Sequence, residues 1–172
     1  ALGSSVASAA PLLQYTFDEA SGPALDTGDA PAADGTLVGA VRSSNTPSGT
    51  GSSIDLTDDA TTYNYVLGPD AAKLDGLSAF TLTTWLNVSE YPSGNHRLVA
   101  KQNAGTFGGF NWSMNAVPND GTVGPDNFRL GLFIGNNVSS GAADFGAGFS
   151  TADVDAASKW VFLAVTYDGT QA

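Results

Sequence analysis

The sequence predicts an all-β protein, built as an antiparallel sandwich of two sheets. Charged residues make up only 13% of its 172 residues. Exposed helix faces usually carry many charges, so their scarcity favours strands. The 21 glycines, together with abundant Ser, Thr, Asp and Asn, indicate many turns. Apolar residues recur in short alternating runs, while stretches with helical periodicity are nearly absent. The length suggests one domain, and 42% hydrophobic residues suffice for a substantial core.

The predicted strands are short segments of β-branched, aromatic and aliphatic residues that end at turn-forming residues. In chain order they are Leu12–Phe17, Thr36–Val41, Ser53–Leu56, Tyr63–Leu67, Phe80–Val88, Arg97–Lys101, Phe110–Asn115, Arg129–Ile134, Asp144–Phe149 and Lys159–Tyr167. Short helical turns are expected at Pro69–Leu77 and Asp153–Lys159.

Two strands alternate clearly. In Phe80–Val88, Trp85 shares a half-polar face with Thr81, Thr83 and Asn87, opposite the apolar residues. In Phe110–Asn115, Trp112 lies on the apolar face, opposite a polar row. The segment Lys159–Tyr167 is apolar on both faces, which predicts a central strand covered on both sides. Neighbouring hairpins around such a strand suit a jelly roll, and a simple barrel is the second choice.

Four segments in order resemble a known family. They are LLQYTFDEASG with the following DGTLVGA (Leu12–Ala40), LDGLSAFTLTTWLNVSEYPSGNHRLVAKQ (Leu74–Gln102), NFRLGLFIGN (Asn127–Asn136) and KWVFLAVTYDGTQ (Lys159–Gln171). Together they are similar to the laminin-G-like jelly rolls of the concanavalin A-like lectin/glucanase superfamily. The resemblance implies a jelly-roll domain over residues 11–172. Because the family continues past the YDG turn, it also implies that the last strands are absent from this sequence.

The charge balance excludes some partners. The net charge is −11, with only six Lys and Arg. Nucleic-acid binding needs a basic patch, so it is not expected, and an anionic membrane surface is disfavoured for the same reason. The sequence contains no run of about 20 apolar residues, so no membrane-spanning helix is expected. A neutral glycan or another cell-surface component remains open as a partner.

The first ten residues, ALGSSVASAA, resemble the end of a secretory signal peptide with an A-x-A cleavage site before Ala10. A floppy leader of small residues is the alternative. The expected location is therefore secreted or at the cell surface of an exporting bacterium.

Catalytic groups are scarce. Glycoside hydrolysis needs two carboxyls flanking the scissile bond. The only glutamates, Glu19 and Glu90, lie in separate turns, and neither has a carboxyl two or four residues away within a strand. His96 is the only histidine and the chain has no cysteine, so a catalytic triad and a zinc site are not expected. A glucanase-like hydrolase is the disfavoured alternative, and no catalytic residue is assigned.

A structural Ca²⁺ is the cofactor that the sequence leaves open. Calcium prefers carboxylate and carbonyl oxygens from loops, and the resemblance implies such an ion. The candidate ligands are Asp26 and Asp34, with Asp29 between them and Asp168 as a weaker candidate. The alternative is that these aspartates form turns by binding backbone N–H groups.

Glycan binding needs an aromatic platform with polar groups around it. Trp85 is the candidate platform, because Trp112 and Trp160 lie among apolar residues and are expected in the core. The polar row Asn111, Ser113 and Asn115 is the candidate source of hydrogen bonds. The sequence therefore predicts a non-catalytic carbohydrate- or surface-binding module. A structural or adhesion domain without a small ligand is the alternative.

Overall fold

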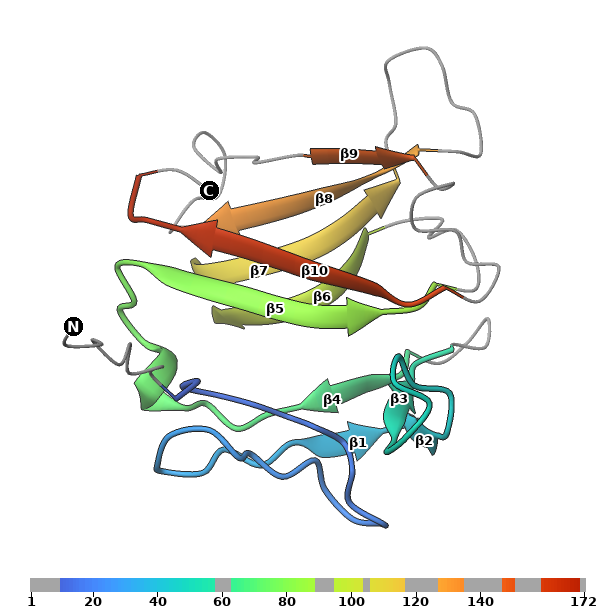
Figure 1. Ribbon diagram of the computed structural model, residues 1–172. Helices are drawn as coiled ribbons and strands as arrows, with labels where there is room; N and C mark the ends of the chain where they lie inside the picture. The colour runs from blue at the N-terminus through green and yellow to red at the C-terminus, as the bar shows by residue number, and fades with distance from the viewer. Residues whose placement is uncertain are drawn as a thin grey trace, which may run out of the picture. The chain divides into compact units, whose positions relative to one another are not determined.

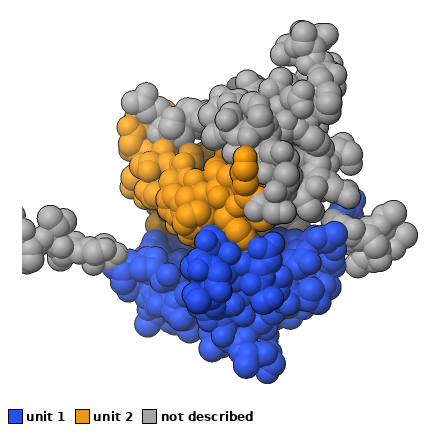
Figure 2. Space-filling view, turned by 45° about the vertical axis from the view of Figure 1, so that its right-hand side comes forward, with its two compact units in different colours: residues 1–75 blue, residues 76–172 orange. Residues whose placement is uncertain are grey.

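The computed structural model describes residues 10–57, 63–88, 95–103, 106–116, 127–134, 147–150 and 159–170 (Figure 1). These residues form ten strands and one short 3-10 turn, with no α-helix. The chain divides into two compact units, unit 1 at residues 1–75 and unit 2 at residues 76–172 (Figure 2). No helical segment in the described part of the chain has the length and apolar character needed to cross a bilayer.

Unit 1 contains two small antiparallel ribbons. Strand β1 (Thr36–Val38) pairs with β4 (Tyr65–Leu67), and β2 (Val41–Ser43) pairs with β3 (Ser53–Asp55). The turn η1 (Ala72–Leu74) follows β4. Among the described residues of unit 1, the buried apolar ones are the alanines Ala24, Ala33 and Ala40. A methyl group buries little apolar area, so the stability of this unit depends more on polar contacts than that of a unit with a large apolar core.

Two sequence expectations for unit 1 are corrected. The strand expected at residues 12–17 is only a single bridge between Tyr15 and Asp26, and Phe17 adopts a left-handed backbone with φ 63°. The strand expected at residues 36–41 is interrupted at Gly39, whose φ is 67°. A left-handed residue breaks the extended ladder, so the chain leaves β1 there and continues as β2.

Gly39→Ala is expected to destabilise the protein by about 2 kcal/mol or more. A Cβ at Gly39 would lie 1.9 Å from Asn64 Oδ1, and the positive φ alone costs about 1 kcal/mol for a non-glycine residue. The Asn64 side chain is held because its amide donates to the Thr57 carbonyl at 2.7 Å. Gly49→Ala is the matched control, since Gly49 has φ 73° and open space around its Cβ position. Urea unfolding of both variants measures the difference, and equal losses would contradict the clash.

Unit 2 is a sandwich of two antiparallel layers (Figure 1). One layer pairs β5 (Phe80–Leu86) with β10 (Val161–Tyr167) along their full lengths. The other layer is a meander of four strands in chain order. They are β6 (Asn95–Asn103), β7 (Thr106–Ala116), β8 (Asn127–Ile134) and β9 (Ala147–Ser150).

The core of unit 2 lies between these layers. Trp112 and Met114 of β7, Leu130 and Leu132 of β8 and Leu163 of β10 are all buried in one cluster. The apolar face of β5, expected from its alternation, packs against this cluster. The predicted all-β antiparallel sandwich of the jelly-roll type is therefore confirmed.

The expectation that β10 is covered on both faces is wrong for the described residues. Val161, Leu163, Val165 and Tyr167 face the core, but Phe162 and the alternate residues after it are exposed. Among the described strands only β5 pairs with β10. Its outer face carries the apolar side chains of Phe162 and Ala164, both of which are exposed among the described residues.

Several predictions lie outside the described residues. They are the leader up to residue 9, Glu90 and most of the turn expected at residues 153–159. The turn expected at residues 69–77 is present as η1. The domain limits at residues 11 and 172 stay a prediction.

Candidate functional site

An uncharged sheet surface on unit 2 carries Trp85 and Phe162, the large exposed aromatic residues among the described side chains of the sandwich. We call it the outer face, and it consists of three cross-strand pairs that all point away from the core. The pairs are Thr81 with Thr166, Thr83 with Ala164, and Trp85 with Phe162. All six residues are exposed and none is charged. Trp85 lies four positions after Thr81, so the face is about 14 Å long at the usual strand rise.

Trp85 and Phe162 form an angled aromatic corner on the outer face. Their ring centroids are 5.3 Å apart and the ring planes are inclined by 59°. The side chains are 51% and 53% exposed, far more than core aromatics. Rings at this angle cannot both lie flat under one planar ligand. With this geometry, one ring could offer a stacking surface to a flat ligand while the other faces that ligand's edge.

At the far end of the outer face, the hydroxyls of Thr81 and Thr166 lie 3.0 Å apart and share a hydrogen bond. The face thus combines apolar ring surface with hydroxyl groups, the mixture found in sites for uncharged polar ligands. Phe162 was missed in the sequence because its partner on the face lies in a distant strand.

The polar row on β7 lies on the opposite side of the sandwich from Trp85. Asn111 and Ser113 alternate with Trp112 and Met114, which face the layer of β5 and β10. Asn111 and Ser113 therefore lie on the side of the four-stranded layer that faces away from β5 and β10. Trp85 lies on the side of the β5–β10 layer that faces away from the core. Ser113 is buried, and its hydroxyl donates to Asn111 Oδ1 at 2.6 Å.

Asn115 occupies the next position of the row in β7, opposite Arg129 of β8. Asn111 and Ser113 point to the far side of the core, so the structure does not bring them together with Trp85 into one site, while the side chain of Asn115 lies outside the described ones. Trp112 is buried as expected, while Trp160, also expected in the core, is only half-buried.

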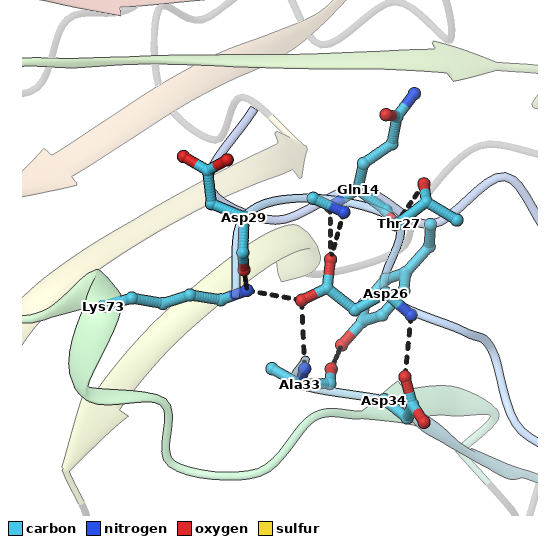
Figure 3. A network of polar contacts seen from close by, with 9 residues as sticks. Gln14, Asp26, Thr27, Asp29, Ala33, Asp34 and Lys73 are labelled. Carbon is cyan, nitrogen blue, oxygen red and sulfur yellow. Dashed lines mark hydrogen bonds and ion pairs between the residues drawn. The ribbon is translucent and has the colours of Figure 1, made fainter. Parts of the chain in front are cut away.

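Asp26 is the centre of a polar network in unit 1 (Figure 3). Its Oδ1 accepts the backbone N–H groups of Gln14 at 3.1 Å and Gly28 at 2.8 Å. Its Oδ2 accepts the N–H of Ala33 at 3.0 Å and the ammonium of Lys73. No part of the Asp26 side chain is solvent-accessible. The carboxylate therefore uses both oxygens, twice each, inside the protein.

Asp34 and Asp29 support the same network in different ways. Asp34 Oδ1 accepts the backbone N–H of Asp26 at 2.9 Å. The carbonyl of Asp29 accepts the Lys73 ammonium at 2.6 Å, while its carboxylate points away from Lys73 (Figure 3). The sequence named these three aspartates as candidate calcium ligands, with binding of backbone N–H groups as the alternative, and it gave no sign of Lys73.

Electrostatics matches this geometry. Burial alone would raise the pKa of Asp26, but the Lys73 ammonium and the three backbone N–H donors outweigh it and lower the pKa to about 2. The neighbouring Tyr15 hydroxyl donates to the Ala33 carbonyl. Burial and the charges of Asp26 and Asp34 raise the Tyr15 pKa. Asp26 is thus a fixed negative charge with its own internal counter-charge.

These residues do not fit a calcium ion. A Ca²⁺ site needs six to eight oxygen ligands, several of them with open lone pairs. Asp26 has four donors on its two oxygens, and Asp34 Oδ1 already accepts a backbone N–H. Across the described ranges, no three acidic, histidine or cysteine side chains converge. Asp168 has the turn-forming role, because its Oδ1 accepts the N–H and the hydroxyl of Thr170 at 2.8 Å each.

Glu19, the one described glutamate, is held by Arg42. The Arg42 guanidinium donates to Glu19 Oε2 at 2.8 Å and to the carbonyls of Phe17, Gly22 and Pro23. Glu19 Oε1 accepts the N–H of Leu25 at 2.8 Å. Burial raises the pKa of Glu19, but Arg42 and the backbone donors outweigh it and lower the pKa. A general acid in glycoside hydrolysis needs a raised pKa, so this environment does not suit that role.

The comparisons with known proteins identify the family. A search of curated proteins and a search of solved structures found no match. The model of one family, Laminin_G_3, described as "Concanavalin A-like lectin/glucanases superfamily", matches residues 59–172. This match covers more than half of the chain, including β4 of unit 1 and all described strands of unit 2. The chain belongs to the Laminin_G_3 family of the concanavalin A-like lectin/glucanase superfamily.

Proposed function

We propose that this chain is a non-catalytic carbohydrate-binding module that holds its ligand on the outer face. The observation that carries the proposal is the exposed corner of Trp85 and Phe162 on an uncharged surface. Membership of a lectin-like superfamily supports glycan binding in general. Exposed tryptophan is also among the residues most enriched in binding hot spots.

The chemistry of the outer face selects a neutral glycan. The apolar C–H face of a sugar ring stacks on Trp85, and the Phe162 ring contacts its edge. The threonine hydroxyls exchange hydrogen bonds with sugar hydroxyls further along the face. No lysine or arginine lies on the face to pair with a sulfate or carboxylate. With a net charge of −11 on the whole chain, an acidic glycan is repelled rather than attracted.

The proposed setting is outside the cytoplasm, where free glycans and cell-surface polysaccharides are accessible. The A-x-A segment before Ala10 supports export. Binding without hydrolysis is supported by the Arg42 contact of Glu19, which keeps that carboxylate ionised and engaged. An adhesion domain without a small ligand is the competing function, and the binding experiment below separates the two.

Trp85→Ala is expected to weaken binding to a glycan array by about 30-fold, since a tryptophan hot spot contributes about 2 kcal/mol. Tyr63→Ala is the matched control, because Tyr63 is an exposed aromatic of unit 1, outside the outer face. The wild type is first screened on neutral and sulfated glycans, and the Kd of the strongest neutral ligand is then measured for both variants. Circular dichroism checks that each variant keeps its fold.

Three results would contradict the proposal. They are an array with no bound glycan, a preference for sulfated glycans, and equal Kd values for wild type and Trp85→Ala. An empty array favours the adhesion function. Release of reducing sugar from a bound glycan would favour the hydrolase.

A further inference from the structure

Lys73 is a cationic side chain taken out of water. Only 8% of its side chain is exposed, whereas lysine is among the residues most seldom buried. Its ammonium donates to Asp26 Oδ2 and to the Asp29 carbonyl (Figure 3). These acceptors are a carboxylate oxygen and a backbone carbonyl oxygen, the same two ligand types that bind hard cations in loops.

The Lys73 ammonium comes from a part of the chain that is distant in sequence from Asp26. Lys73 is the middle residue of η1, which is closed by hydrogen bonds from Leu74 N–H to the Ala71 carbonyl and from Asp75 N–H to the Ala72 carbonyl. Asp26 lies 47 residues earlier in sequence. The ion pair therefore ties the end of unit 1 to its early acidic loop, as a metal ion shared between two segments does.

We infer that Lys73 supplies, from within the chain, the cation of this acidic loop, so that the Asp26 loop is held without a divalent metal ion. The three backbone donors on Asp26 shape the loop, and the ammonium neutralises it. Removal of the ammonium leaves Asp26 Oδ2 and the Asp29 carbonyl facing an open position. An added Ca²⁺ then has two protein oxygens and the space for water molecules that complete its six to eight ligands, which the wild type does not offer.

The test compares melting temperatures of the full chain in millimolar Ca²⁺ and in chelator. The wild type is expected to melt at the same temperature in both. Lys73→Ala is expected to melt about 10 °C lower in chelator, because a buried charge loses its partner. Millimolar Ca²⁺ is expected to return about 3 °C or more of that loss, since binding to the folded state stabilises it.

Two further variants assign the response to this position. In Lys73→Met the side chain keeps its length and fills the position, so Ca²⁺ is expected to have no effect on melting. In the double variant Lys73→Ala with Asp26→Asn, the carboxylate ligand is also removed and the Ca²⁺ response is expected to vanish. Terbium luminescence, excited through tyrosine, gives a second readout because Tyr15 lies in the same network.

The inference is overturned if Ca²⁺ raises the melting temperature of the wild type and Asp26→Asn removes that effect. It is also overturned if Lys73→Ala melts like the wild type, or if its melting does not respond to Ca²⁺. Should Lys73→Ala fail to fold in chelator, refolding in Ca²⁺ but not in Mg²⁺ supports the inference, and failure in both overturns it. The comparison of wild-type melting temperatures in Ca²⁺ and in chelator tests the inference whether or not Lys73→Ala folds.

Discussion

Asp26→Asn is expected to lower the free energy of unfolding by about 3 kcal/mol or more, the range for breaking a buried ion pair from one side. The asparagine oxygen can still accept the N–H groups of Gln14 and Gly28. Its amide nitrogen would then face the Ala33 N–H and the Lys73 ammonium, so donors would oppose donors. The buried ammonium also loses its counter-charge, which adds the desolvation cost of an unpaired charge.

Asp29→Asn is the matched control for this prediction. It changes the same charge within the same loop, but its carboxylate is exposed and points away from Lys73, while its carbonyl contact is kept. Urea unfolding at pH 7 is expected to show a change within about 0.5 kcal/mol for Asp29→Asn. If the two variants lose equal stability, the network around Asp26 does not hold unit 1.

The same variant has a defined dependence on pH. The pKa of Asp26 is lowered from 3.8 to about 2 in the folded protein, so the folded state favours the ionised carboxylate. This stabilisation is complete above about pH 5 and is lost as the pH falls from about 4 through 2. The shift amounts to about 2 kcal/mol, since one pKa unit corresponds to about 1.4 kcal/mol. Stability measured between pH 7 and pH 2 should fall less steeply for Asp26→Asn than for Asp29→Asn.

Local pattern was enough to predict most of unit 2. The alternation in β7 correctly placed Trp112 inside, and the alternation in β5 correctly placed its apolar face against the core. The strands of unit 2 lie within a few residues of their predicted ranges. This works because side chains of a strand point alternately to its two faces, and each of these strands has one face in the core. A strong period-2 pattern thus contains both the secondary structure and the direction of burial.

Long-range partners were not predictable from the same pattern. Phe162 meets Trp85 only because β10 pairs with β5 in one register, and nothing local to either strand specifies that register. Lys73 meets Asp26 across 47 residues, and a lone lysine in a short turn gives no local sign of burial. The sequence therefore identified Trp85 of the outer face without Phe162, and Asp26 of the polar network without Lys73.

The failed strand at residues 12–17 has a physical cause in the same network. The run LLQYTF has the composition of a strand, yet Gln14 N–H donates to the Asp26 side chain instead of to a partner strand. Neighbouring carbonyls are used by the loop as well, since Thr27 N–H donates to Gln14 and Asp29 N–H donates to Pro11. Side-chain acceptors that satisfy backbone groups compete with a regular ladder.

Trp112→Ala is expected to destabilise the protein by about 3–5 kcal/mol, the range for large aromatic-to-alanine changes in a core. Trp112 is 2% exposed, and its position in β7 lies between Val99 of β6 and Leu132 of β8. Its ring packs in the cluster that joins the two layers, so its loss leaves a cavity where the layers meet. Thermal and urea unfolding measure the loss, and a change below about 1 kcal/mol would contradict this packing.

Trp85→Ala is the control for Trp112→Ala, because it removes the same side chain from the same sandwich. Trp85 is half exposed, so its replacement is expected to cost less than half as much stability. Trp112→Ala should therefore lose mainly stability. Trp85→Ala should stay folded and lose mainly glycan affinity. If Trp112→Ala does not fold, Trp112→Phe, with a smaller cavity, gives the same comparison. Binding that falls only in proportion to the unfolded fraction in both variants would mean that the outer face holds no ligand.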